Sequence, residues 1–343
     1  MVKYLIKLFW GEVFYYVGLF HIVSFLYNVW GKRITIVTYH RITEKKINEI
    51  EASLPFLFTS QQAFEKQLGF LKKYYRLITF KDLIAYDKIE NIPWNSLIIT
   101  FDDGYEDNFF KASIILEKMH LAGTFFIPAN NIGLENCDLY WWDRAFYYFG
   151  EMQKQKYDKK KLIDGIDKRI LPFFQEFINN PSNLFQSLNE WDTEEIELML
   201  DEIQEKYKID NKKMCMENRV LNKEQVFILG ERGDIGSHGC SHYNLLKVSQ
   251  DRKFYEVHES KRIIEEISKK KVLAFSCPGG NMDGDLGKLV RDAGYEFAVT
   301  TESGINDMDD RYSLKRINIW DGTSLSLNGK FSKGFFAFKL LGF

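Results

Sequence analysis

The chain has 343 residues, 45% of them hydrophobic, which is enough to bury one large core or two ordinary ones and excludes a disordered chain. Its 46 basic and 48 acidic residues give a formal net charge of -2, so the overall charge does not attract nucleic acid, and we expect no nucleic-acid partner. Four cysteines without CxxC spacing argue against a disulfide framework or a zinc ribbon and favour a reducing compartment.

Residues 1–32 are predicted to form one apolar or amphipathic helix. Between Lys7 and Lys32 the only ionisable side chains are Glu12, His21 and several tyrosines, and the length is compatible with a membrane span. No small-residue cleavage site follows, which argues against export by a signal peptide. Because the polar and small residues gather on one narrow stripe, we expect this helix to lie in a membrane interface or to cover the domain. Anchoring of the protein by this helix is the alternative.

Short apolar runs then alternate with segments of helical periodicity. The runs predict buried strands at 34–39, 77–80, 97–101, 124–129, 234–237, 272–277 and 297–301. The periodic segments predict helices at 60–75, 108–120, 222–233, 253–270 and 285–294. This alternation indicates an α/β protein with a parallel sheet, and about seven such units can close into a barrel whose functional residues follow the carboxyl ends of the strands.

Two segments depart from the alternation. Residues 151–218 are rich in Lys, Glu, Asp and Gln and have no strand candidate, so they predict a helical insertion. Within the C-terminal tail 321–343, residues 329–343 combine three lysines with five phenylalanines and no acid. Interleaved basic and aromatic residues favour a membrane interface, so we expect a cytoplasmic protein peripheral to a membrane that it contacts through both termini. The alternative is that both ends pack on each other or on the barrel.

Asp102 and Asp103 stand side by side directly after the apolar run 97–101, and a glycine follows them. Two ionised carboxylates so close repel each other, so a protein usually keeps such a pair where a cation, a hydrogen-bond network or a proton relieves the repulsion. By itself an Asp-Asp-Gly sequence is more often a turn.

His238 and His242 follow the predicted strand 234–237. Two neutral imidazoles and one carboxylate form a ligand set for a divalent metal, with open positions for water and substrate. Such a metal would relieve the repulsion between the aspartates, because one of them binds it while the other acts as a base on a water that the metal activates. A His-x-x-x-His pair alone is weak, but the joint occurrence of both pieces at strand ends is specific.

Around these residues the sequence resembles the polysaccharide deacetylases with the NodB-homology domain, in the branch found with surface-polysaccharide synthesis. "TFDDGY" (100–105) is similar to the first motif of that family and "SHGCSH" (237–242) to the second, while "SCPGG" (276–280) stands where the family has Arg-x-Pro-x-Gly. The resemblance covers about residues 33–320 without the insertion. It implies a distorted, incomplete (β/α) barrel of about seven parallel strands, similar to a TIM barrel.

The resemblance also implies a role for each motif residue. Asp102 would be the catalytic base. One divalent metal, with zinc as the first choice among several suitable ions, would be bound by Asp103, His238 and His242. Substrate contacts would come from Tyr105, Pro278, Gly279 and Gly280.

Two positions depart from the family pattern. Ser276 replaces the motif arginine, and no histidine follows His258, so the late Leu-x-His general acid of the family is missing. Arg316 could supply the guanidinium, and His40, after the first predicted strand, could supply the acid or bind substrate. The structural alternatives are a surface arginine and a histidine that is hydrogen-bonded in the core.

Trp141, Trp142 and Asp143 follow the predicted strand 124–129 after a loop. Aromatic faces in a cleft suit sugar rings, so we predict substrate contacts here. The alternative is that the tryptophans pack under the insertion.

These observations predict a metal-dependent hydrolase that removes N- or O-linked acetyl groups from a carbohydrate in the synthesis or modification of a polysaccharide. The alternative is a catalytically impaired carbohydrate-binding protein of the same fold. An aspartyl phosphotransferase is disfavoured because that chemistry requires Asp-x-Asp rather than adjacent aspartates.

Overall fold

The computed structural model describes residues 2–29, 34–45, 49–51, 53–86, 91–134, 140–154, 168–179, 184, 187–188 and 191–342. The chain divides into two compact units. The first consists of Met1–Glu44, Phe58–Gly133 and Val220–Phe343, and the second of Lys45–Leu57 and Leu134–Arg219. The second unit contains the described part of the predicted insertion. The assignment of 33–320 as the functional domain and of 321–343 as a tail stays a prediction.

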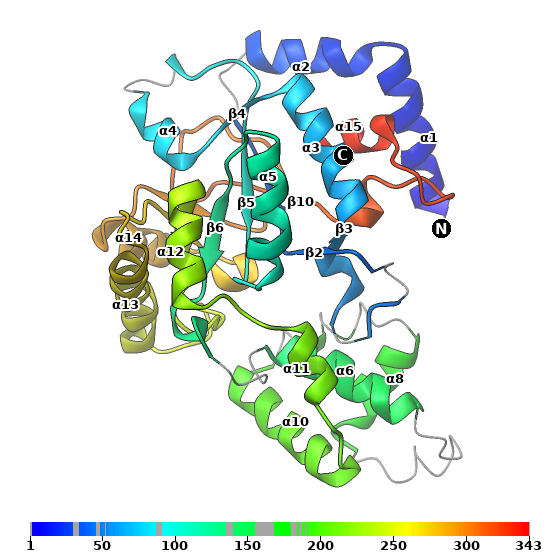
Figure 1. Ribbon diagram of the computed structural model, residues 1–343, viewed down its shortest axis with the longest axis vertical. Helices are drawn as coiled ribbons and strands as arrows, with labels where there is room; N and C mark the ends of the chain where they lie inside the picture. Colours follow the sequence, from blue (N-terminus) through cyan, green and yellow to red (C-terminus); the bar gives the residue numbers. More distant parts are fainter. Residues whose placement is uncertain are drawn as a thin grey trace. The chain divides into compact units, whose positions relative to one another are not determined.

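The first unit is built on a curled parallel sheet with strand order β10-β1-β5-β6-β7-β8-β9, and β4 also pairs with β5 (Figure 1). The strands are β1 Ile34–Tyr39, β4 Arg76–Ile78, β5 Ser96–Phe101, β6 Thr124–Ile127, β7 Asp234–Ser237, β8 Ala274–Ser276, β9 Phe297–Val299 and β10 Ile317–Asn318. A single bridge between Val299 and Leu314 joins β9 to the segment before β10. The predicted distorted, incomplete barrel is therefore confirmed.

All seven predicted strands are present, with ends that differ by two residues at most. The sequence analysis missed β10, because two residues are too few to show a periodicity. It also missed the small parallel pair β2 (Arg41–Thr43) and β3 (Phe58–Ser60).

Helices of the first unit cover the outer face of the sheet, except α4 (Phe80–Ala85), whose Phe80 and Leu83 pack with residues inside the barrel such as Ile98 (Figure 1). They are α3 Gln61–Tyr74, α4 Phe80–Ala85, α5 Ile114–Lys118, α12 Lys223–Arg232, α13 Gln250–Ser268 and α14 Gly284–Asp292, and a π-helical segment, Asn108–Ser113, leads into α5. Two of these helices begin with a side-chain cap. The Ser60 side chain caps the N-terminus of α3, and Asn222 and Gln225 form a capping box at the N-terminus of α12.

Alternate residues of the strands pack into two separate cores. Ile36 and Ile98 belong to the cluster inside the barrel, whereas Val37 and Ile99 belong to the cluster between the sheet and its helices. Because both faces are buried, the strands read as continuous apolar runs in the sequence. The alternation also sets which side chains face inward at the carboxyl ends of the strands, where the candidate site lies.

The N-terminal segment forms two helices, α1 (Val2–Tyr16) and α2 (Leu19–Val29), so the prediction of a single helix over 1–32 was wrong. The break falls at Gly18, whose φ of +83° lies in the left-handed region that interrupts an α-helix. On one face α1 packs closely against α15 (Lys333–Leu340), where Gly11 and Gly334 let the two backbones approach (Figure 1). No helix in the described part of the chain has the length and hydropathy needed to span a bilayer.

The second unit is helical in its described part, with α6 Trp141–Lys154, α8 Leu171–Asn179, α10 Thr193–Tyr207 and α11 Lys212–Glu217. The buried guanidinium of Arg144 on α6 pairs with Glu197 and Asp201 on α10. Cys215 of α11 is disulfide-bonded, whereas Cys240 and Cys277 are free, so the argument from cysteine spacing against disulfides is wrong for Cys215. Wide spacing in the sequence gave no sign of this bond, because only the fold brings distant thiols together.

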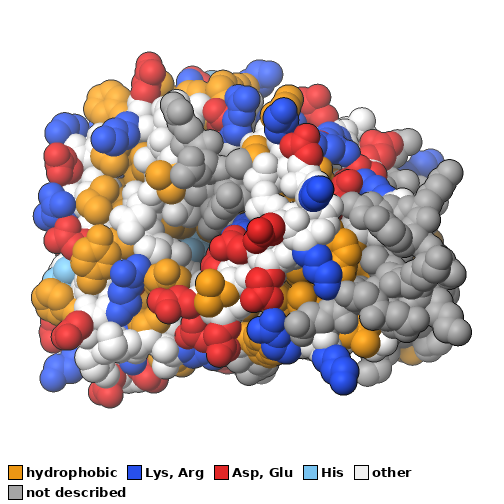
Figure 2. Space-filling model, turned by 90° about the horizontal axis from the view of Figure 1, so that it is seen from below, with side chains coloured by type: hydrophobic (Ala, Val, Ile, Leu, Met, Phe, Trp, Pro, Cys, Tyr) orange, Lys and Arg blue, Asp and Glu red, His pale blue; other side chains and the backbone are white. Residues whose placement is uncertain are grey.

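The surface follows the nearly neutral composition. Figure 2 shows basic and acidic side chains spread over one face of the molecule, with acidic side chains gathered near its middle and no continuous basic area among the coloured residues.

Candidate metal centre and catalytic site

Asp102 and Asp103 leave the end of β5 in different directions. The amide of Asp102 donates to the carbonyl of Tyr39 at 3.0 Å and so continues the pairing of β5 with β1. Asp103 and Gly104 then adopt φ values of +71° and +66°. A positive φ at a non-glycine residue is strained and is concentrated at functional sites. The turn gives the two adjacent carboxylates different neighbours.

Asp103 lies against the two predicted metal ligands. Its Oδ1 is 3.4 Å from Nε2 of His238 and 3.4 Å from Nε2 of His242. One potential ligand atom from each of the three residues lies within 4.8 Å of the others. Two ligands bound tetrahedrally at about 2.1 Å from an ion lie about 3.4 Å apart, so the observed separations fit a divalent cation.

The tautomer of His238 is also suited to a metal. Its Nδ1 lies 2.7 Å from the carbonyl oxygen of Ser276, which can only accept, so Nδ1 carries the proton and Nε2 presents its lone pair to the Asp103 side. Such an outer hydrogen bond is the usual support of a metal-binding histidine. We therefore conclude that Asp103, His238 and His242 can hold one divalent ion.

Asp102 pairs with Arg316 instead. Nη1 and Nη2 of Arg316 each donate to one carboxylate oxygen of Asp102 at 2.7 Å. Arg316 is 1% exposed and donates further to the Thr300 carbonyl, at 2.9 Å, and to the Thr38 hydroxyl, at 3.1 Å. The predicted contact of Arg316 with Asp102 is present, and the alternative of a surface arginine is wrong.

The structure also shows how Ser276 fits the position of the missing motif arginine. Its hydroxyl oxygen accepts a hydrogen bond from Nη2 of Arg316 at 3.0 Å and lies 3.5 Å from Asp102. A small side chain at 276 leaves the space that the guanidinium from the 316 position occupies. The guanidinium beside Asp102 therefore comes from Arg316, the residue directly before β10, rather than from the end of β8.

Burial and charge together set the protonation of the two aspartates. Burial is the largest influence on the pKa of Asp102 and raises it, but Arg316 and His238 outweigh burial, so the pKa lies below its ordinary value. Burial likewise raises the pKa of Asp103, but its interactions with His238 and His242 hold that pKa well below the usual range. Both carboxylates are therefore ionised at neutral pH; the partner of Asp102 is the guanidinium of Arg316, and the partners of Asp103 are the two imidazoles.

His40 directly follows β1 and stands two residues after Thr38, so continued strand alternation places both on the same face of the sheet. Thr38 pairs with Thr100 in β5, which lies two residues before Asp102. An electrostatic interaction with His40 is among the smaller influences that lower the pKa of Asp102 and the pKa of Asp103. The Nδ1 of His40 is buried and has no hydrogen-bond partner among the described residues. Nδ1 therefore makes no hydrogen bond within the described part of the core, and the roles of His40 as an acid or in substrate binding stay predictions.

The predicted substrate residues have different surroundings. Tyr105 is fully buried, and the Arg41 guanidinium lies 4.1 Å from its ring centre. Trp141 and Trp142 belong to the second unit, are 7% and 5% exposed, and contact each other edge to face. Asp143 is buried there and accepts a short hydrogen bond from the Ser53 hydroxyl. Little of these four side chains is exposed, and their roles in binding stay predictions.

Pro278, Gly279 and Gly280 form a tight turn after β8, and both glycines have positive φ values. A Cβ on Gly280 would lie 1.9 Å from Oγ1 of Thr301, so only glycine fits. The turn is at the carboxyl end of the sheet, as predicted, and its contact with substrate stays a prediction.

Sequence reasoning missed Glu256 on α13, which is fully buried. Its Oε2 accepts hydrogen bonds from the amides of Cys240 and Ser241, at 2.6 and 2.9 Å, and Arg252 pairs with its other oxygen at 2.9 Å. Glu256 therefore fixes the loop that carries His238 and His242. The available signal was an acid on the apolar face of an amphipathic helix, four residues after an arginine.

Cys240 and Cys277 are buried near these loops, and burial raises the pKa of each thiol to about 12. A metal ligand must be a thiolate, so both are suited to packing rather than to coordination.

A barrel of parallel strands with polar groups at their carboxyl ends places the protein in the (β/α)-barrel class of enzyme folds. Residues 188–298 match the sequence profile of the family described as polysaccharide deacetylase. This segment is therefore similar to polysaccharide deacetylases, and it contains the second predicted motif, 237–242.

Two curated proteins show the sequence similarity. The poly-beta-1,6-N-acetyl-D-glucosamine N-deacetylase of Staphylococcus epidermidis is 28% identical over 108 residues, which are 29% of this chain and 37% of that protein. YxkH of Bacillus subtilis is 27% identical over 113 residues, 32% of this chain and 40% of that protein. The matched segments thus span about two fifths of the length of these relatives.

Solved structures show the same fold. The Streptococcus pyogenes deacetylase PplD in complex with acetate superposes with a TM-score of 0.55 at 17% identity, over 85% of this chain and 94% of that one. IcaB from Ammonifex degensii superposes with a TM-score of 0.52 at 15% identity, over 84% of this chain and 92% of that one. At these identities the similarity concerns the fold alone.

Proposed function

We propose that the protein is a metal-dependent carbohydrate deacetylase. The observation that carries the proposal is the pairing of a buried, ionised Asp102 with Arg316 next to the group formed by Asp103, His238 and His242. One residue is thus held as a base beside a separate ligand set, which is the division of labour that hydrolysis of an acetyl group requires.

A divalent ion bound there, with zinc as our first choice, would polarise the acetyl carbonyl and make a water molecule more acidic. Asp102 would accept the proton of the attacking water at a carboxylate oxygen, and Arg316 would keep that carboxylate ionised and oriented. His40, whose Nδ1 has no hydrogen-bond partner among the described residues, would donate a proton to the departing nitrogen or oxygen. The products would be acetate and an unmodified amino or hydroxyl group on the sugar.

The substrate class is proposed from the relatives. The Staphylococcus epidermidis relative is named for N-deacetylation of a poly-N-acetylglucosamine, and PplD was solved with acetate, the expected product. We therefore propose an acetylated sugar or polysaccharide as the substrate, in polysaccharide synthesis or modification, with an N-acetyl group tested first and an O-acetyl group second.

Acetate release tests the proposal. The full-length protein is incubated with N- and O-acetylated oligosaccharides, with and without a chelator. We expect release that stops with the chelator and returns when zinc is added.

Asp102→Asn should lower turnover by roughly 100-fold to 10,000-fold, because an amide cannot accept the proton, while the metal content stays unchanged. Asp285→Asn, an exposed carboxylate of α14, is the matched control. Near-normal rates in Asp102→Asn would show that another group is the base. Glycan binding without acetate release under all conditions would favour the carbohydrate-binding alternative.

We also propose that the protein works peripherally at a membrane surface. Exposed apolar side chains on α1 and α2 support this, including Phe9 and Trp10, which are 63% and 56% exposed. The cytoplasmic side stays a prediction from the sequence. The disulfide at Cys215 argues for an oxidising compartment, and thiol labelling of intact cells against lysed cells would decide between the two sides.

A further inference from the structure

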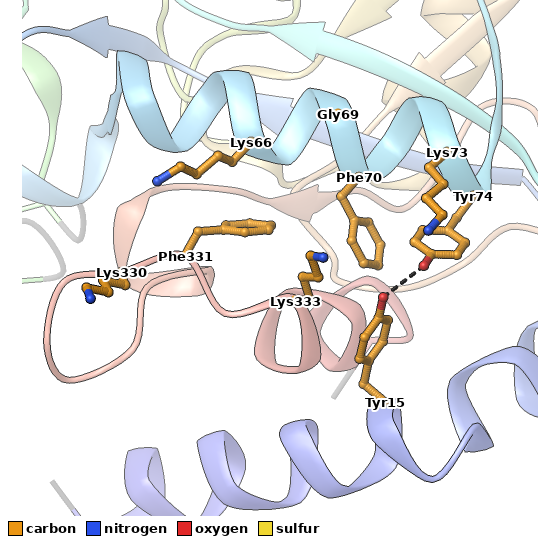
Figure 3. Close-up of a pocket in the computed structure, with 9 residues that line it drawn as sticks. All are labelled: Tyr15, Lys66, Gly69, Phe70, Lys73, Tyr74, Lys330, Phe331 and Lys333. Atoms are coloured by element: carbon orange, nitrogen blue, oxygen red, sulfur yellow. Dashed lines mark hydrogen bonds between the residues drawn. The ribbon is translucent and has the colours of Figure 1, made fainter.

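The first unit has a cavity, separate from the residues of the candidate catalytic site, between α1, α3 and the loop before α15 (Figure 3). Its volume is about 560 Å³. Its polar lining consists of four lysines and two tyrosines: Lys66, Lys73, Lys330, Lys333, Tyr15 and Tyr74. A cavity with this lining is a strongly cationic site on a protein whose net charge is -2.

The spacing on α3 explains why its lysines converge. Lys66, Phe70, Lys73 and Tyr74 stand at positions i, i+4, i+7 and i+8, which is one face of a helix. Figure 3 shows Lys66 and Lys73 extending from this face, with Lys333 of α15 approaching from the other side of the cavity. Segments more than 250 residues apart in the chain thus bring like charges together, which is unfavourable unless an anion compensates them.

The described residues provide no such anion. None of the four lysines forms an ion pair with a described carboxylate, and all four side chains are exposed. Glu12 is the acidic residue of α1 and stands three residues before Tyr15, which lines the cavity. Its carboxylate accepts a hydrogen bond from the Ser332 hydroxyl instead. The cluster therefore keeps its positive charge available for a ligand.

The remaining lining suits a phosphate group with an organic substituent. The hydroxyls of Tyr15 and Tyr74 lie 2.8 Å apart, so one proton joins the pair and the other is free to donate to a ligand. The aromatic rings of Phe70 and Phe331 line the same space. Ammonium and hydroxyl donors beside apolar rings match an oxyanion attached to a partly apolar molecule.

The face of α1 that is turned away from α15 identifies the source of that phosphate. Gly11 and Phe14 contact α15, whereas Ile6, Phe9 and Trp10 of α1 are 51%, 63% and 56% exposed. Exposed aromatic and aliphatic side chains next to lysines are the pattern of a helix that enters the interface of an anionic bilayer.

We propose that the lysine cavity binds the headgroup phosphate of an anionic phospholipid while the exposed apolar face of α1 and α2 enters the bilayer surface. The inference rests on the proposed action at a membrane and deepens it, because it makes the binding dependent on lipid charge and assigns it to named residues. It is independent of the residues that remove the acetyl group.

Vesicle sedimentation of the full-length protein tests the proposal. Vesicles of phosphatidylcholine alone are compared with vesicles that contain 30% phosphatidylglycerol, about 30% being a composition with a strong negative surface potential. We expect binding to the anionic vesicles only. The double variant Lys66→Gln and Lys73→Gln should lower that partitioning by roughly 25-fold, at roughly five-fold for each lysine.

Lys72→Gln is the matched control. Lys72 stands on the same helix and has the same charge, but its Nζ donates to the carbonyl of Met119, at 2.7 Å, and it does not line the cavity. We expect a change below about two-fold. Acetate release from a soluble substrate should be unchanged in all these variants, which also shows that they are folded.

The outcomes separate the proposals. Equal binding to both kinds of vesicle, or equal losses from the cavity variants and from Lys72→Gln, would overturn the lysine site and leave membrane association standing. No binding to any vesicle by a protein that releases acetate would overturn both the lipid site and the membrane association, but not the deacetylase. If inorganic phosphate protects the cavity lysines from acetylation and anionic vesicles do not, the site is one for a soluble phosphate, and the lipid proposal is wrong.

Discussion

Asp102 and Asp103 are neighbours in the chain, yet the structure gives each carboxylate its own polar partners. Asp102 has the guanidinium of Arg316, and Asp103 has the two imidazoles. The sequence raised the question of what relieves their repulsion, and a metal alone is not the answer. The turn with positive φ after Asp102 separates the two environments.

The first prediction concerns Arg316. In Arg316→Gln the raising effect of burial on the pKa of Asp102 is no longer outweighed by the guanidinium, so the carboxylate takes up a proton at higher pH than before. We expect the acid limb of the kcat/KM profile to move to higher pH, and the free energy of unfolding near neutral pH to fall by about 3–5 kcal/mol, because a buried charge loses its partner.

The native pKa of Asp102 is lowered, so its stabilising contribution is present above the unfolded value and is lost as the pH falls through the folded value. The loss of stability in Arg316→Gln should therefore shrink in acid. Arg316→Lys keeps a charge without the paired hydrogen bonds and should lie between the two proteins. A pH profile that does not move in either variant would show that Arg316 does not act through Asp102.

The second prediction concerns Glu256 as a positioning residue. Glu256→Ala removes the acceptor that fixes the loop of His238 and His242, so we expect metal affinity to fall by roughly 10-fold to 100-fold, measured by competition with a coloured chelator. Glu259→Ala on the same helix, where the carboxylate only pairs with Arg262 at the surface, is the control. A loss of activity that saturating metal does not restore would contradict the positioning role.

At the scale of elements, the contact of α1 with α15 depends on two glycines. A Cβ on Gly334 would lie 2.5 Å from the Cα of Glu12, and one on Gly11 would lie 3.0 Å from the carbonyl oxygen of Gly334. The two ends of the chain therefore pack on each other through one face, as one of the sequence alternatives states, while the opposite face of α1 stays exposed.

The third prediction follows from this contact. Gly334→Ala should lower the free energy of unfolding by about 1–3 kcal/mol, because the two helix backbones must move apart. Gly69→Ala in α3 is the control: no heavy atom lies within 4 Å of the added Cβ, and better helix propensity should raise the stability by up to about 1 kcal/mol. Equal effects in thermal or urea unfolding would mean that the α1–α15 contact does not contribute to global stability.

At the scale of the whole molecule, the fourth prediction is that divalent metal stabilises the fold. The ligands come from the ends of β5 and β7, so the complete ligand set exists only in the folded chain. An ion that binds only the folded chain, at a free concentration 100 times its dissociation constant, adds about 2.7 kcal/mol to the free energy of unfolding. We expect calorimetry to show a lower Tm in chelator and recovery with zinc. His238→Ala should abolish the difference between the two conditions, and a Tm that is the same with and without zinc in the native protein would contradict a resident metal.

The sequence by itself determined the parallel barrel and the residues of its central site. Strands buried on both faces appear as apolar runs, and the carboxyl ends of parallel strands meet at one edge, so Asp103, His238 and His242 could be grouped without coordinates. The sequence shows where the strands lie because the apolar run of a buried strand is visible within a few consecutive residues.

Only the tertiary structure decided the long-range partners. The contact of Arg316 with Asp102 joins residues 214 positions apart, and the break at Gly18 and the disulfide of Cys215 gave no distinctive local pattern. The lysine cavity is of the same kind, since α3 and the loop before α15 are distant in the chain. Such contacts form because burying the apolar faces of the helices and strands fixes where polar groups meet, and that packing is a property of the whole chain rather than of any segment.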